Sequence, residues 1–466
     1  MKQIDIGKKE NIHLIGIGGI GMSGLAKIMK TMGFKVQGSD LKKNKNIESC
    51  KKLGIKIFIG HSSANIKSAT IIVKSSAIKD SNLEIREAKK KKLPIFRRAE
   101  MLANIISLKK NIIITGSHGK TTTTSLVSKI LSESKLDPTI INGGVINSLK
   151  SNAKFGKGDW TVIEADESDG SFLKLPINYS IVTNIDHEHM DYYENFKNLE
   201  TAFIKFINKT PPIGKSLVCI DNLNVKKIIK KTTTKNLLTY GLNKKADYQI
   251  IKIKYFQDRT KFDLIIKNFN GKKKTVTNIF VNLIGDHNVQ NATAAISICL
   301  NLGIKINIIK KALSNFTGVQ RRMTKIFTQN SNEFFDDYAH HPTEISAVLN
   351  GVSKLSNKKR IISIFQPHRY SRINSLKLDF AKSFKKSDLV ILCPVYSAGE
   401  NKDKNYNQFN FSKLISDNSK VQVINVRNER ELSNYLRKNL LFNNTVIGMG
   451  AGSISDWMRN LKKDLI

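Results

Sequence analysis

The chain has 466 residues and carries 77 lysine and arginine residues against 38 aspartate and glutamate residues, a formal net charge of +39. At about 150 residues per domain, this length predicts about three domains. The four cysteines form no CxxC pair, which argues against a disulfide framework and a cysteine zinc site. Because no run reaches the ~18 apolar residues of a membrane span and no apolar signal region follows Met1, we expect a cytoplasmic protein without stable membrane insertion.

The positive charge is distributed along the whole chain. Runs such as Lys89–Lys92 and Lys272–Lys274 lie far apart, and no basic stripe alternates with aromatic residues as a surface for stacked bases would. We therefore expect no specific nucleic-acid partner. The positive field would still attract polyanions and phosphorylated substrates.

Strand and helix patterns alternate in the first part of the chain. Apolar runs typical of strands occur at Ile12–Ile15, Lys35–Gly38, Ile55–Ile59, Thr70–Val73 and Ile95–Phe96. A helix pattern at Gly21–Met32 follows the first of them. The alternation predicts a parallel, doubly wound sheet of the Rossmann type.

A GxGxxG turn joins the first strand to the first helix of this block. The glycines and the helix N-terminus bind a pyrophosphate, and Asp40, 19 positions after Gly21, ends the second strand, where a carboxylate can bind a ribose hydroxyl. A nicotinamide dinucleotide and a UDP-sugar satisfy these constraints equally well. The candidate nucleotide contacts are Gly18, Gly19, Ile20, Gly21 and Asp40.

A second glycine turn follows the apolar run Ile112–Ile114 and precedes a helix pattern at Thr123–Glu133. This order is typical of a phosphate-binding loop, in which Lys120 reaches the terminal phosphates and Thr121 offers a hydroxyl to Mg²⁺. Two residues, instead of the usual four, separate its glycines. The candidate phosphate-binding residues are Gly116, Ser117, His118, Gly119, Lys120, Thr121 and Thr122.

Two polar clusters follow the next predicted strands. Residues 164–169 include four carboxylates, of which Glu164, nearest the strand, is the expected Mg²⁺ ligand; a solvated acidic turn is the alternative. After Tyr179–Ile185 come His187 and His189, of which only one can serve the same metal. A histidine here is more often an ordinary loop residue, but its place beside the Glu164 strand favours a ligand.

The remainder of the second block contains a hairpin-like segment, Tyr248–Leu283 with Asn270-Gly271, which predicts a small antiparallel annex. A helix pattern follows. Asn288 and Asn291 lie one turn apart on it and can read an adenine edge, although helix capping explains them equally well.

The third block again alternates strands and helices from near Arg321. Its strand patterns are Glu333–Asp336, Arg360–Phe365, Leu389–Cys393, Val421–Val426 and Thr445–Ile447. Polar clusters after the first two of them combine guanidinium groups with aromatic hydroxyls, which suits a carboxylate ligand. The alternative for Arg372 is a place on a solvated helix face, as is common in so basic a protein.

Together, these motifs resemble the Mur ligase family. The resemblance rests on the motifs Gly16–Gly24, Gly116–Thr122, Glu164–Asp169, His287–Asn291 and Asp337–Pro342, in that order. It implies an α/β protein with three domains: an N-terminal Rossmann-like domain (1–108) that binds a UDP-linked substrate, a central P-loop ATPase (109–319) with a parallel sheet plus a small antiparallel sheet, and a C-terminal Rossmann-like domain (320–466) for the amino acid.

The resemblance also implies an activity: ATP-dependent joining of L-alanine to the lactyl carboxylate of UDP-N-acetylmuramate, through an acyl phosphate, in cytoplasmic peptidoglycan precursor synthesis. ATP and Mg²⁺ are the implied cofactors, and the oligomeric state stays open. Carried over by motif, Thr121, Glu164 and His189 hold the metal, and Asn288, Asn291 and Asp337 contact ATP.

Further roles follow from the same resemblance. His61 joins the UDP site, and Arg322 reaches phosphate from the third domain. The implied group around the reacting carboxylate and amino acid is Tyr338, His340, His368, Arg369 and Arg372. The implied catalytic residues are Lys120, Glu164, His189, Arg322, His340 and Arg369.

Four alternatives stay open. A ligase that attaches a murein tripeptide to UDP-N-acetylmuramate would share these motifs, and glycine or L-serine could replace L-alanine, since one methyl group is worth only ~1–3 kcal/mol in a pocket. A basic P-loop ATPase acting on nucleic acid would leave the first fold without a role, and an NAD-dependent oxidoreductase would leave Lys120 without one.

Ser117, where the family usually has threonine, is a mild departure because the backbone does most of the binding.

Overall fold

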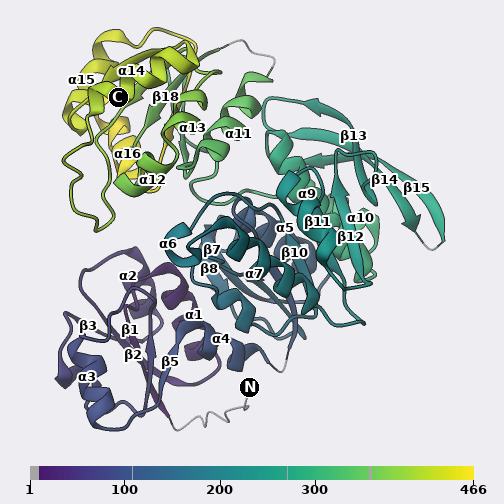
Figure 1. Cartoon of the computed structure of the whole chain (residues 1–466), viewed down its shortest axis with the longest axis vertical. Coiled ribbons are helices and arrows are strands. Elements are labelled where there is room, and N and C mark those ends of the chain that lie inside the picture. Colours follow the sequence, from purple (N-terminus) through teal and green to yellow (C-terminus); the bar gives the residue numbers. More distant parts are fainter. Residues whose placement is uncertain (1–9, 108, 270, 356–358, 466) are drawn as a thin grey trace. The chain divides into compact units, whose positions relative to one another are not determined.

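The computed structural model describes residues 10–107, 109–269, 271–355 and 359–465. By its internal contacts, the described chain divides into two compact units. The first contains the residues up to 252, 262–281 and 290–317, and the second contains 253–261, 282–289 and the residues from 318 on. Figure 1 labels some of the helices and strands of each unit.

The first sheet is parallel, with the strand order β3-β2-β1-β4-β5. Its strands are β1 (Asn11–Ile15), β2 (Lys35–Asp40), β3 (Lys56–Ile59), β4 (Ile71–Lys74) and β5 (Ile95–Arg97). Its helices are α1 (Ile20–Thr31), α2 (Lys45–Lys52), η1 (Ser63–Ile66), α3 (Leu83–Lys90) and α4 (Arg98–Ile106). The order reverses at β1, and the glycine turn after β1 lies at that point, as the Rossmann-type prediction requires.

Both faces of this sheet are buried, because the strands are apolar at consecutive positions. On β4, Ile71 and Val73 face a cluster that also contains residues of α1, α2 and α4, while Ile72 faces a second cluster with Ile85 and Ala88 of α3. Successive strand residues point to opposite faces, so a continuous apolar run is what a sheet covered on both sides needs.

The central sheet has ten strands in the order β15-β14-β13-β12-β11-β10-β6-β9-β7-β8. Its strands are β6 (Lys110–Thr115), β7 (Thr139–Ile146), β8 (Ser151–Lys154), β9 (Trp160–Glu164), β10 (Tyr179–Val182), β11 (Ser216–Cys219), β12 (Leu237–Gly241), β13 (Tyr248–Tyr255), β14 (Thr260–Phe269) and β15 (Lys272–Val281). The helices of this part are α5 (Lys120–Glu133), η2 (Ser171–Lys174), α6 (Met190–Tyr193), α7 (Phe196–Asn208), α8 (Leu223–Ile228), η3 (Ile229–Lys231), α9 (Asp286–Asn301) and α10 (Ile306–Ser314). Because β6 lies between β9 and β10, the segments that follow these three strands meet at one edge.

The edges of the central sheet differ from the sequence expectation in one respect. The predicted annex is continuous with the parallel sheet, because β13 pairs in parallel with β12 at Tyr240 and Gly241. Of the predicted turn at Asn270-Gly271, Asn270 lies outside the described residues. An antiparallel hairpin of β7 and β8 forms the opposite edge, and its polar, glycine-containing sequence gave no strand signal.

The third sheet has six strands in the order β16-β17-β21-β18-β19-β20. Its elements are β16 (Thr324–Gln329), β17 (Asn332–Asp337), α11 (Pro342–Ser353), β18 (Arg360–Phe365), α12 (Tyr370–Ser375), α13 (Lys377–Lys382), β19 (Leu389–Leu392), α14 (Gln408–Ser419), β20 (Gln422–Asn425), α15 (Glu429–Asn439), β21 (Asn444–Met449) and α16 (Ile454–Leu465). Only β16 is antiparallel to its neighbour, so the sheet is Rossmann-like with one antiparallel edge strand. One face packs on α11, α13 and α14, and the other packs on α15 and α16.

Helix α1 of the first sheet packs on β7 and β8 of the central sheet. Asn152 of β8 donates from Nδ2 to the carbonyl of Ile20 over 2.8 Å and lies 3.4 Å from the Lys27 ammonium. A Cβ at Gly24 would lie 3.1 Å from Asn152 Nδ2 and 3.4 Å from Ala153 Cβ, so a side chain here would have to displace Asn152. Buried residues of α1 and of both sheets, Met22, Ile12 and Ile141 among them, form one hydrophobic cluster.

We expect Gly24→Leu to lower the free energy of unfolding by about 1–3 kcal/mol, because the added side chain has no space between α1 and β8. Urea denaturation followed by circular dichroism measures the change. Thr31→Leu, at an exposed position of the same helix, adds a similar side chain without the contact and serves as the control. Equal stability of the two variants would contradict the close packing.

Candidate active site

The phosphate-loop motif follows β6 and begins α5 at Lys120. Gly116 has φ of +129°, and a Cβ there would lie 2.2 Å from Thr183 Oγ1. Gly119 has φ of +82°, and a Cβ there would lie 2.5 Å from Asn291 Oδ1. Both positions therefore require glycine, for the backbone conformation and for the space.

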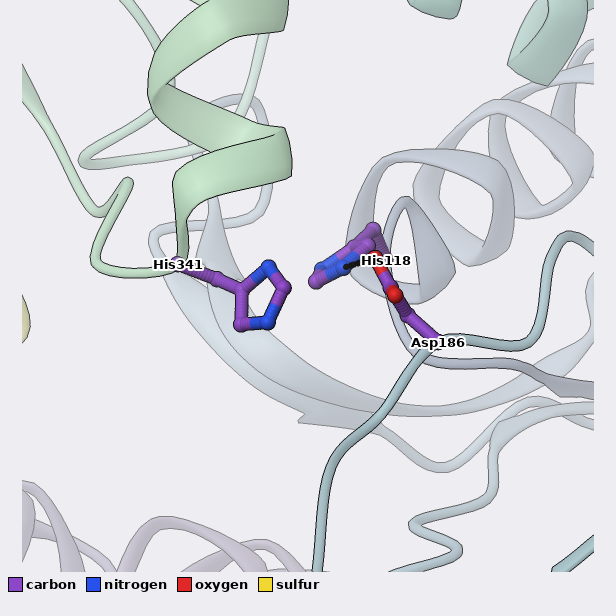
Figure 2. A group of neighbouring side chains, drawn as sticks. All are labelled: His118, Asp186 and His341. Carbon is purple, nitrogen blue, oxygen red and sulfur yellow. Dashed lines mark hydrogen bonds and ion pairs between the residues drawn. The ribbon is translucent and has the colours of Figure 1, made fainter. Parts of the chain in front are cut away.

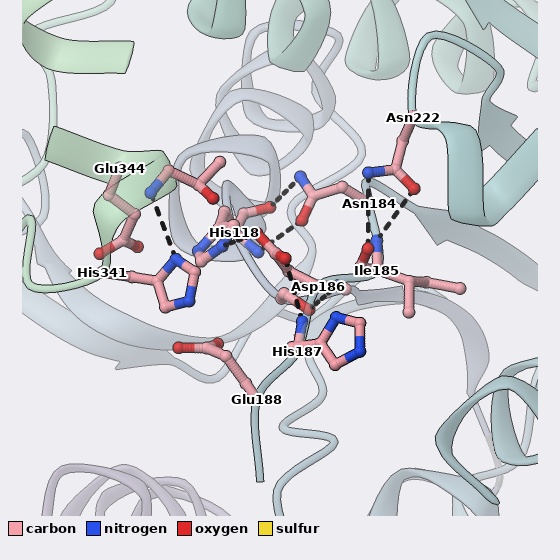
Figure 3. A network of polar contacts seen from close by, with 12 residues as sticks. His118, Asn184, Ile185, Asp186, His187, Glu188, Asn222, His341 and Glu344 are labelled. Atoms are coloured by element: carbon pink, nitrogen blue, oxygen red, sulfur yellow. Dashed lines mark hydrogen bonds and ion pairs between the residues drawn. The ribbon is translucent and has the colours of Figure 1, made fainter. Parts of the chain in front are cut away.

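The segment after β10 holds this loop in place (Figure 3). His118 donates its backbone N–H to Asn184 Oδ1 over 2.8 Å, and its carbonyl accepts from Asn184 Nδ2 and Thr183 Oγ1. Ser117 Oγ accepts the backbone N–H of Asp186 over 2.8 Å. The loop is thus fixed by side chains of its neighbouring strand before any ligand is considered.

The His118 ring also contacts this segment. Its Nε2 lies 3.2 Å from Asp186 Oδ2. Figure 2 shows these two side chains next to each other. Sequence reasoning placed His118 in the nucleotide site through its backbone, whereas Asp186 received no role. The pair adds a charge-assisted contact to the backbone bonds that hold the loop.

Lys120 is the cation of the site. Its Nζ donates to the carbonyls of Gly116 and Ser117, at 2.5 and 3.1 Å, and to both carboxylate oxygens of Glu167, at 2.8 and 3.1 Å. Burial by itself would lower the pKa of Lys120, but the charges of Glu167, Asp166 and Glu164 raise it. The group therefore carries a full positive charge at neutral pH.

The carboxylate expected to bind the metal lies beside the loop. Glu164, the last residue of β9, accepts the Thr121 hydroxyl over 2.9 Å and the backbone N–H of Gly143 over 2.5 Å. Thr121 and Glu164 are thus together, as the sequence predicts. Oxygen donors of this kind suit Mg²⁺.

His189 lies with a different pair of carboxylates. Its Nε2 is 3.5 Å from Glu167 Oε1, and the ligand atoms of Asp166, Glu167 and His189 all lie within 4.8 Å of one another. Burial lowers the pKa of His189, but Glu167, Glu188 and Asp166 outweigh it and raise the pKa. Glu167, which sequence reasoning ranked below Glu164, is 1% exposed and is the residue that joins Lys120 to His189.

The two asparagines of α9 make separate contacts. Asn291 accepts the Thr123 hydroxyl over 3.2 Å and lies against Gly119. Asn288 donates from Nδ2 to the carbonyl of Ile284 over 2.8 Å, a local bond that differs from a helix cap, in which the side-chain oxygen accepts a backbone N–H. Asn291 is therefore the one placed beside the phosphate loop.

The glycine turn of the first sheet is fixed by polar side chains. Gly18 donates its N–H to Asp40 Oδ2 over 2.8 Å, and its carbonyl accepts from Asn44 and Asn46, at 3.2 and 2.9 Å. Sequence reasoning named Asp40 but not the asparagines. A Cβ at Gly21 would lie 3.1 Å from the Arg98 guanidinium, so Arg98, which was also not predicted, covers the start of α1.

The predicted residues of the third sheet lie together. The rings of Tyr338 and His340 are 5.2 Å apart, those of His340 and His368 are 5.7 Å apart, and Arg372 lies 3.1 Å from His368 Nδ1. The Arg322 guanidinium lies over the Tyr338 ring at 5.4 Å. Burial, together with Arg372 and Arg369, lowers the pKa of His368 to about 4, so its ring is neutral at pH 7.

One member of this cluster was missed. The ring of Tyr396, which follows β19, stacks on His368 at 5.7 Å, and its carbonyl accepts the N–H of Arg369 over 2.9 Å. Arg369 itself has φ of +68°. The sequence signal was weak, since a single tyrosine after a strand is common.

Asp337 is nearly fully buried at the end of β17. Its two oxygens accept the backbone N–H groups of Met323 and Ala339, at 2.7 and 2.8 Å. Burial raises the pKa of Asp337 to about 6, although Arg322 and the two N–H groups act in the opposite direction. Both oxygens thus already accept hydrogen bonds from backbone N–H groups of the same unit.

The fold and these residues define a nucleotide-binding α/β protein with a lysine-containing phosphate loop. Residues 11–110 match the Mur ligase family catalytic domain, residues 114–299 match the Mur ligase middle domain, and residues 321–452 match the Mur ligase glutamate ligase domain. The chain therefore belongs to the Mur ligase family.

Relatives of similar length carry a more specific name. UDP-N-acetylmuramate–L-alanine ligase of Pelagibacter ubique is 55% identical over 460 residues, which cover 98% of this chain and 99% of the relative. The Brucella anthropi enzyme of the same name is 41% identical, with 97% of each chain covered.

Solved structures agree with these matches. The UDP-N-acetylmuramate–alanine ligase of Thermotoga maritima superposes with a TM-score of 0.81 at 28% identity, over 97% of this chain and 98% of its own. A murein peptide ligase of Psychrobacter arcticus, at 21% identity and a TM-score of 0.71 over 98% of both chains, shares the fold.

The carboxyl group of Asp337 should make stability depend on pH. Because its folded pKa of about 6 lies above the ordinary value of 3.8, the proton favours the folded state, and this contribution is complete below about pH 4 and lost as the pH rises through about 6. The free energy of unfolding of the wild type, measured relative to that of Asp337→Asn, should fall by about 2–3 kcal/mol between about pH 4 and about pH 7. Urea titrations at several pH values measure it.

Asp379→Asn, at an exposed position of α13, removes the same charge from the surface and is the control. It should follow the wild-type pH dependence. Parallel pH profiles for wild type and Asp337→Asn would show that the buried carboxyl does not contribute.

Proposed function

We propose that this chain is an ATP-dependent ligase that joins L-alanine to the lactyl carboxylate of UDP-N-acetylmuramate and releases ADP and phosphate, a step in peptidoglycan precursor synthesis. One observation carries the proposal: a UDP-N-acetylmuramate–L-alanine ligase is 55% identical over nearly the whole chain. The site described above supplies groups suited to each step.

The first step activates the carboxylate. A carboxylate oxygen attacks the γ-phosphorus of ATP, the bond to the β-phosphate oxygen breaks, and ADP leaves. Charge on the phosphoryl oxygens is stabilised by positively charged groups placed in advance, and Lys120 in the loop after β6 is such a group. When ATP enters, its phosphate oxygens take up contacts with Lys120 in competition with Glu167.

The second step forms the amide. The alanine amine attacks the acyl carbon, the bond to the phosphate oxygen breaks, and phosphate leaves as the nitrogen loses a proton. We propose that Arg322, Tyr338, His340, His368, Arg369 and Arg372 surround the reacting carboxylate and the amino acid. The neutral His368 ring accepts from Arg372 at Nδ1, so its hydrogen is on Nε2, which can donate to an oxygen of the reacting carboxylate.

We propose Mg²⁺ as the metal of the reaction; when bound, it would neutralise negative charge on the phosphate groups. The residues present fit it, because Thr121 and Glu164 lie together beside the loop and Asp166, Glu167 and His189 gather a second set of donor atoms. Thr121, Glu164 and His189 remain the proposed ligands, to which the structure adds Glu167 as a neighbour of His189.

The remaining binding roles are also proposals. Gly18, Gly19, Ile20, Gly21, Asp40 and His61 bind the UDP part. Residues 116–122 with Asn288, Asn291 and Asp337 bind ATP; Asn291 is supported by its place beside Gly119, and Asn288 and Asp337 already have backbone partners.

We propose domains 1–108, 109–319 and 320–466, which the three matched family segments support. In the described part of the chain, each helix is too short or too polar to span a bilayer. We propose the cytoplasm as the location, because ATP and the nucleotide-linked precursor are available there.

The deciding experiment measures ADP release with ATP, Mg²⁺ and UDP-N-acetylmuramate, adding L-alanine, glycine, L-serine or a murein tripeptide separately. We expect L-alanine to give the highest kcat/KM, with glycine lower by roughly 10-fold or more, and no turnover in EDTA. Turnover with the tripeptide alone would select the peptide ligase instead. ADP release without any amino donor would contradict ligase function.

Lys120→Ala should lower kcat by at least about 100-fold, because it removes the group that stabilises the transferred phosphoryl oxygens. The affinity for UDP-N-acetylmuramate, measured calorimetrically, should change less than about twofold, since the glycine turn after β1 provides that site. Lys129→Ala, in the same helix and paired with Glu133 at the surface, is the matched control. An equal kcat for both variants would contradict the proposed role of Lys120 in the reaction.

A further inference from the structure

Glu84 is a carboxylate with no exposed surface, in the first turn of α3. Five groups lie around its oxygens, and all have a hydrogen to donate. Oε1 accepts from Asn65 Nδ2 at 2.6 Å and from the Ser62 N–H at 3.4 Å. Oε2 accepts from Ser39 Oγ at 2.6 Å and faces His61 Nδ1 at 3.3 Å and His13 Nε2 at 3.5 Å.

This arrangement holds the carboxylate in its ionised form. Burial by itself would raise the pKa of Glu84, but the nearby His13 ring and the hydrogen bonds from Ser39 and Asn65 outweigh burial and lower the pKa to about 2. A fully buried charge is costly in a fold that could place an apolar residue there. Such a group is therefore a candidate for a function other than stability.

The hydrogen positions in the network can be assigned from its partners. Ser39 has one hydroxyl hydrogen, and it goes to Glu84, so Ser39 Oγ is an acceptor toward His61 Nδ1, 3.1 Å away. His61 Nδ1 therefore carries a hydrogen, shared between Ser39 and Glu84. His61 Nε2 makes no hydrogen bond with any described residue and is not fully buried.

The His13 ring carries its hydrogen on the other nitrogen, Nε2. The Gln37 amide nitrogen donates to the Asn65 carbonyl over 3.0 Å and lies 3.2 Å from His13 Nδ1, while Gln37 Oε1 accepts from Ser68. His13 Nδ1 is therefore an acceptor, and His13 Nε2–H faces Glu84. His13 is completely buried, so of the two histidines only His61 has a nitrogen open to a ligand.

The network is joined directly to the glycine turn. The Ser39 carbonyl accepts the N–H groups of Gly16 and Ile17, at 2.9 and 3.0 Å. The next residue, Asp40, accepts from Gly18 with its side chain and from Gly60, adjacent to His61, with its carbonyl. His61 and the turn are thus held by two consecutive residues of β2, at the edge where α1 presents its N-terminus to a diphosphate.

We propose that Glu84 is a positioning residue for the nucleoside-diphosphate part of the substrate: together with Ser39, it holds His61 with Nδ1–H turned inward and Nε2 turned to the ligand at the glycine turn. This rests on the proposed function, because His61 is a UDP contact only if the chain binds a UDP-linked substrate. Glu84 touches no substrate, and its whole effect passes through His61.

A double-mutant cycle tests the proposal, with calorimetric binding of UDP-N-acetylmuramate in the absence of ATP as the readout. Glu84→Gln and His61→Ala should each weaken binding about 10-fold, and the double variant should be weaker by about 10-fold as well, not about 100-fold, because both changes remove the same contact. Multiplicative losses, or unaltered binding in Glu84→Gln, would overturn the proposal. Glu48→Gln, an exposed acid of α2, is the control.

Two further readouts separate positioning from a general structural effect. Steady-state assays of Glu84→Gln should show a higher KM for UDP-N-acetylmuramate, with kcat and the KM for ATP within about twofold of wild type. Nitrogen NMR of the imidazoles should show a hydrogen on His61 Nδ1 in the wild type and a mixture of tautomers in Glu84→Gln. A persistent Nδ1–H signal in that variant would contradict the role of Glu84.

If Glu84→Gln does not fold, Ser39→Ala replaces it in the cycle, since it removes one of the two groups that hold His61 Nδ1. The same non-additivity with His61→Ala is expected, and additivity would overturn the proposal. Failure of the wild type to bind UDP-N-acetylmuramate would instead contradict the proposed function, and the present inference would fall with it. If the wild type binds UDP-N-acetylmuramate and the Glu84 and Ser39 variants bind it equally well, the positioning role of Glu84 is contradicted and the proposed function is not.

Discussion

The central site depends on one ion pair, in which Glu167 neutralises the charge of the Lys120 ammonium group. Lys120 lies largely inside the protein at the start of α5, and its charge is stable there because Glu167 presents both oxygens to it. Removing one partner of such a pair leaves a charge without compensation, which is strongly destabilising. The pair therefore fixes the path of the chain after β9, and through Glu167 it fixes the position of His189.

The same rule of construction operates in all three sheets. Parallel strands end at a common edge, and the segments after them carry the polar residues: Asp40 and His61 in the first sheet, residues 116–122 and 164–169 in the central sheet, and Asp337 and His368 in the third. Helices cover both faces of the first and third sheets, so these faces are apolar. The polar groups therefore lie at the edge formed by the carboxyl ends of the strands. This is why the positions of motifs after apolar runs were informative.

Sequence reasoning predicted the fold well where strands are apolar and regular, and failed where they are not. The runs that became β1, β6 and β18 were recognised from their continuous apolar residues. In contrast, β7 contains two consecutive glycines, and β8 and β16 are edge strands with more polar sequences. Edge strands are stabilised by one neighbour and by the backbone, so their sequences carry little signal. The continuity of β12 with β13 depends on register, which periodicity does not report.

In the site, proximity to a strand favoured Glu164 over Glu167. The structure shows why that criterion is incomplete: the chain turns back after β9, with Gly170 at φ of +66° and the Glu167 carbonyl bonded to the Tyr193 hydroxyl at 2.5 Å. That turn depends on a residue 26 positions away, so no local pattern could reveal it. Asn44, Asn46 and Arg98 escaped prediction for a similar reason, since each reaches the glycine turn from another element.

The contact of α1 with β7 and β8 has a thermodynamic consequence. Residues of the first and central sheets share one hydrophobic cluster, so the two sheets are expected to unfold together. A ligand bound only to the folded state stabilises everything that unfolds with its site. A nucleotide at the glycine turn would therefore protect the amides of the central sheet from hydrogen exchange, in addition to those around its own site.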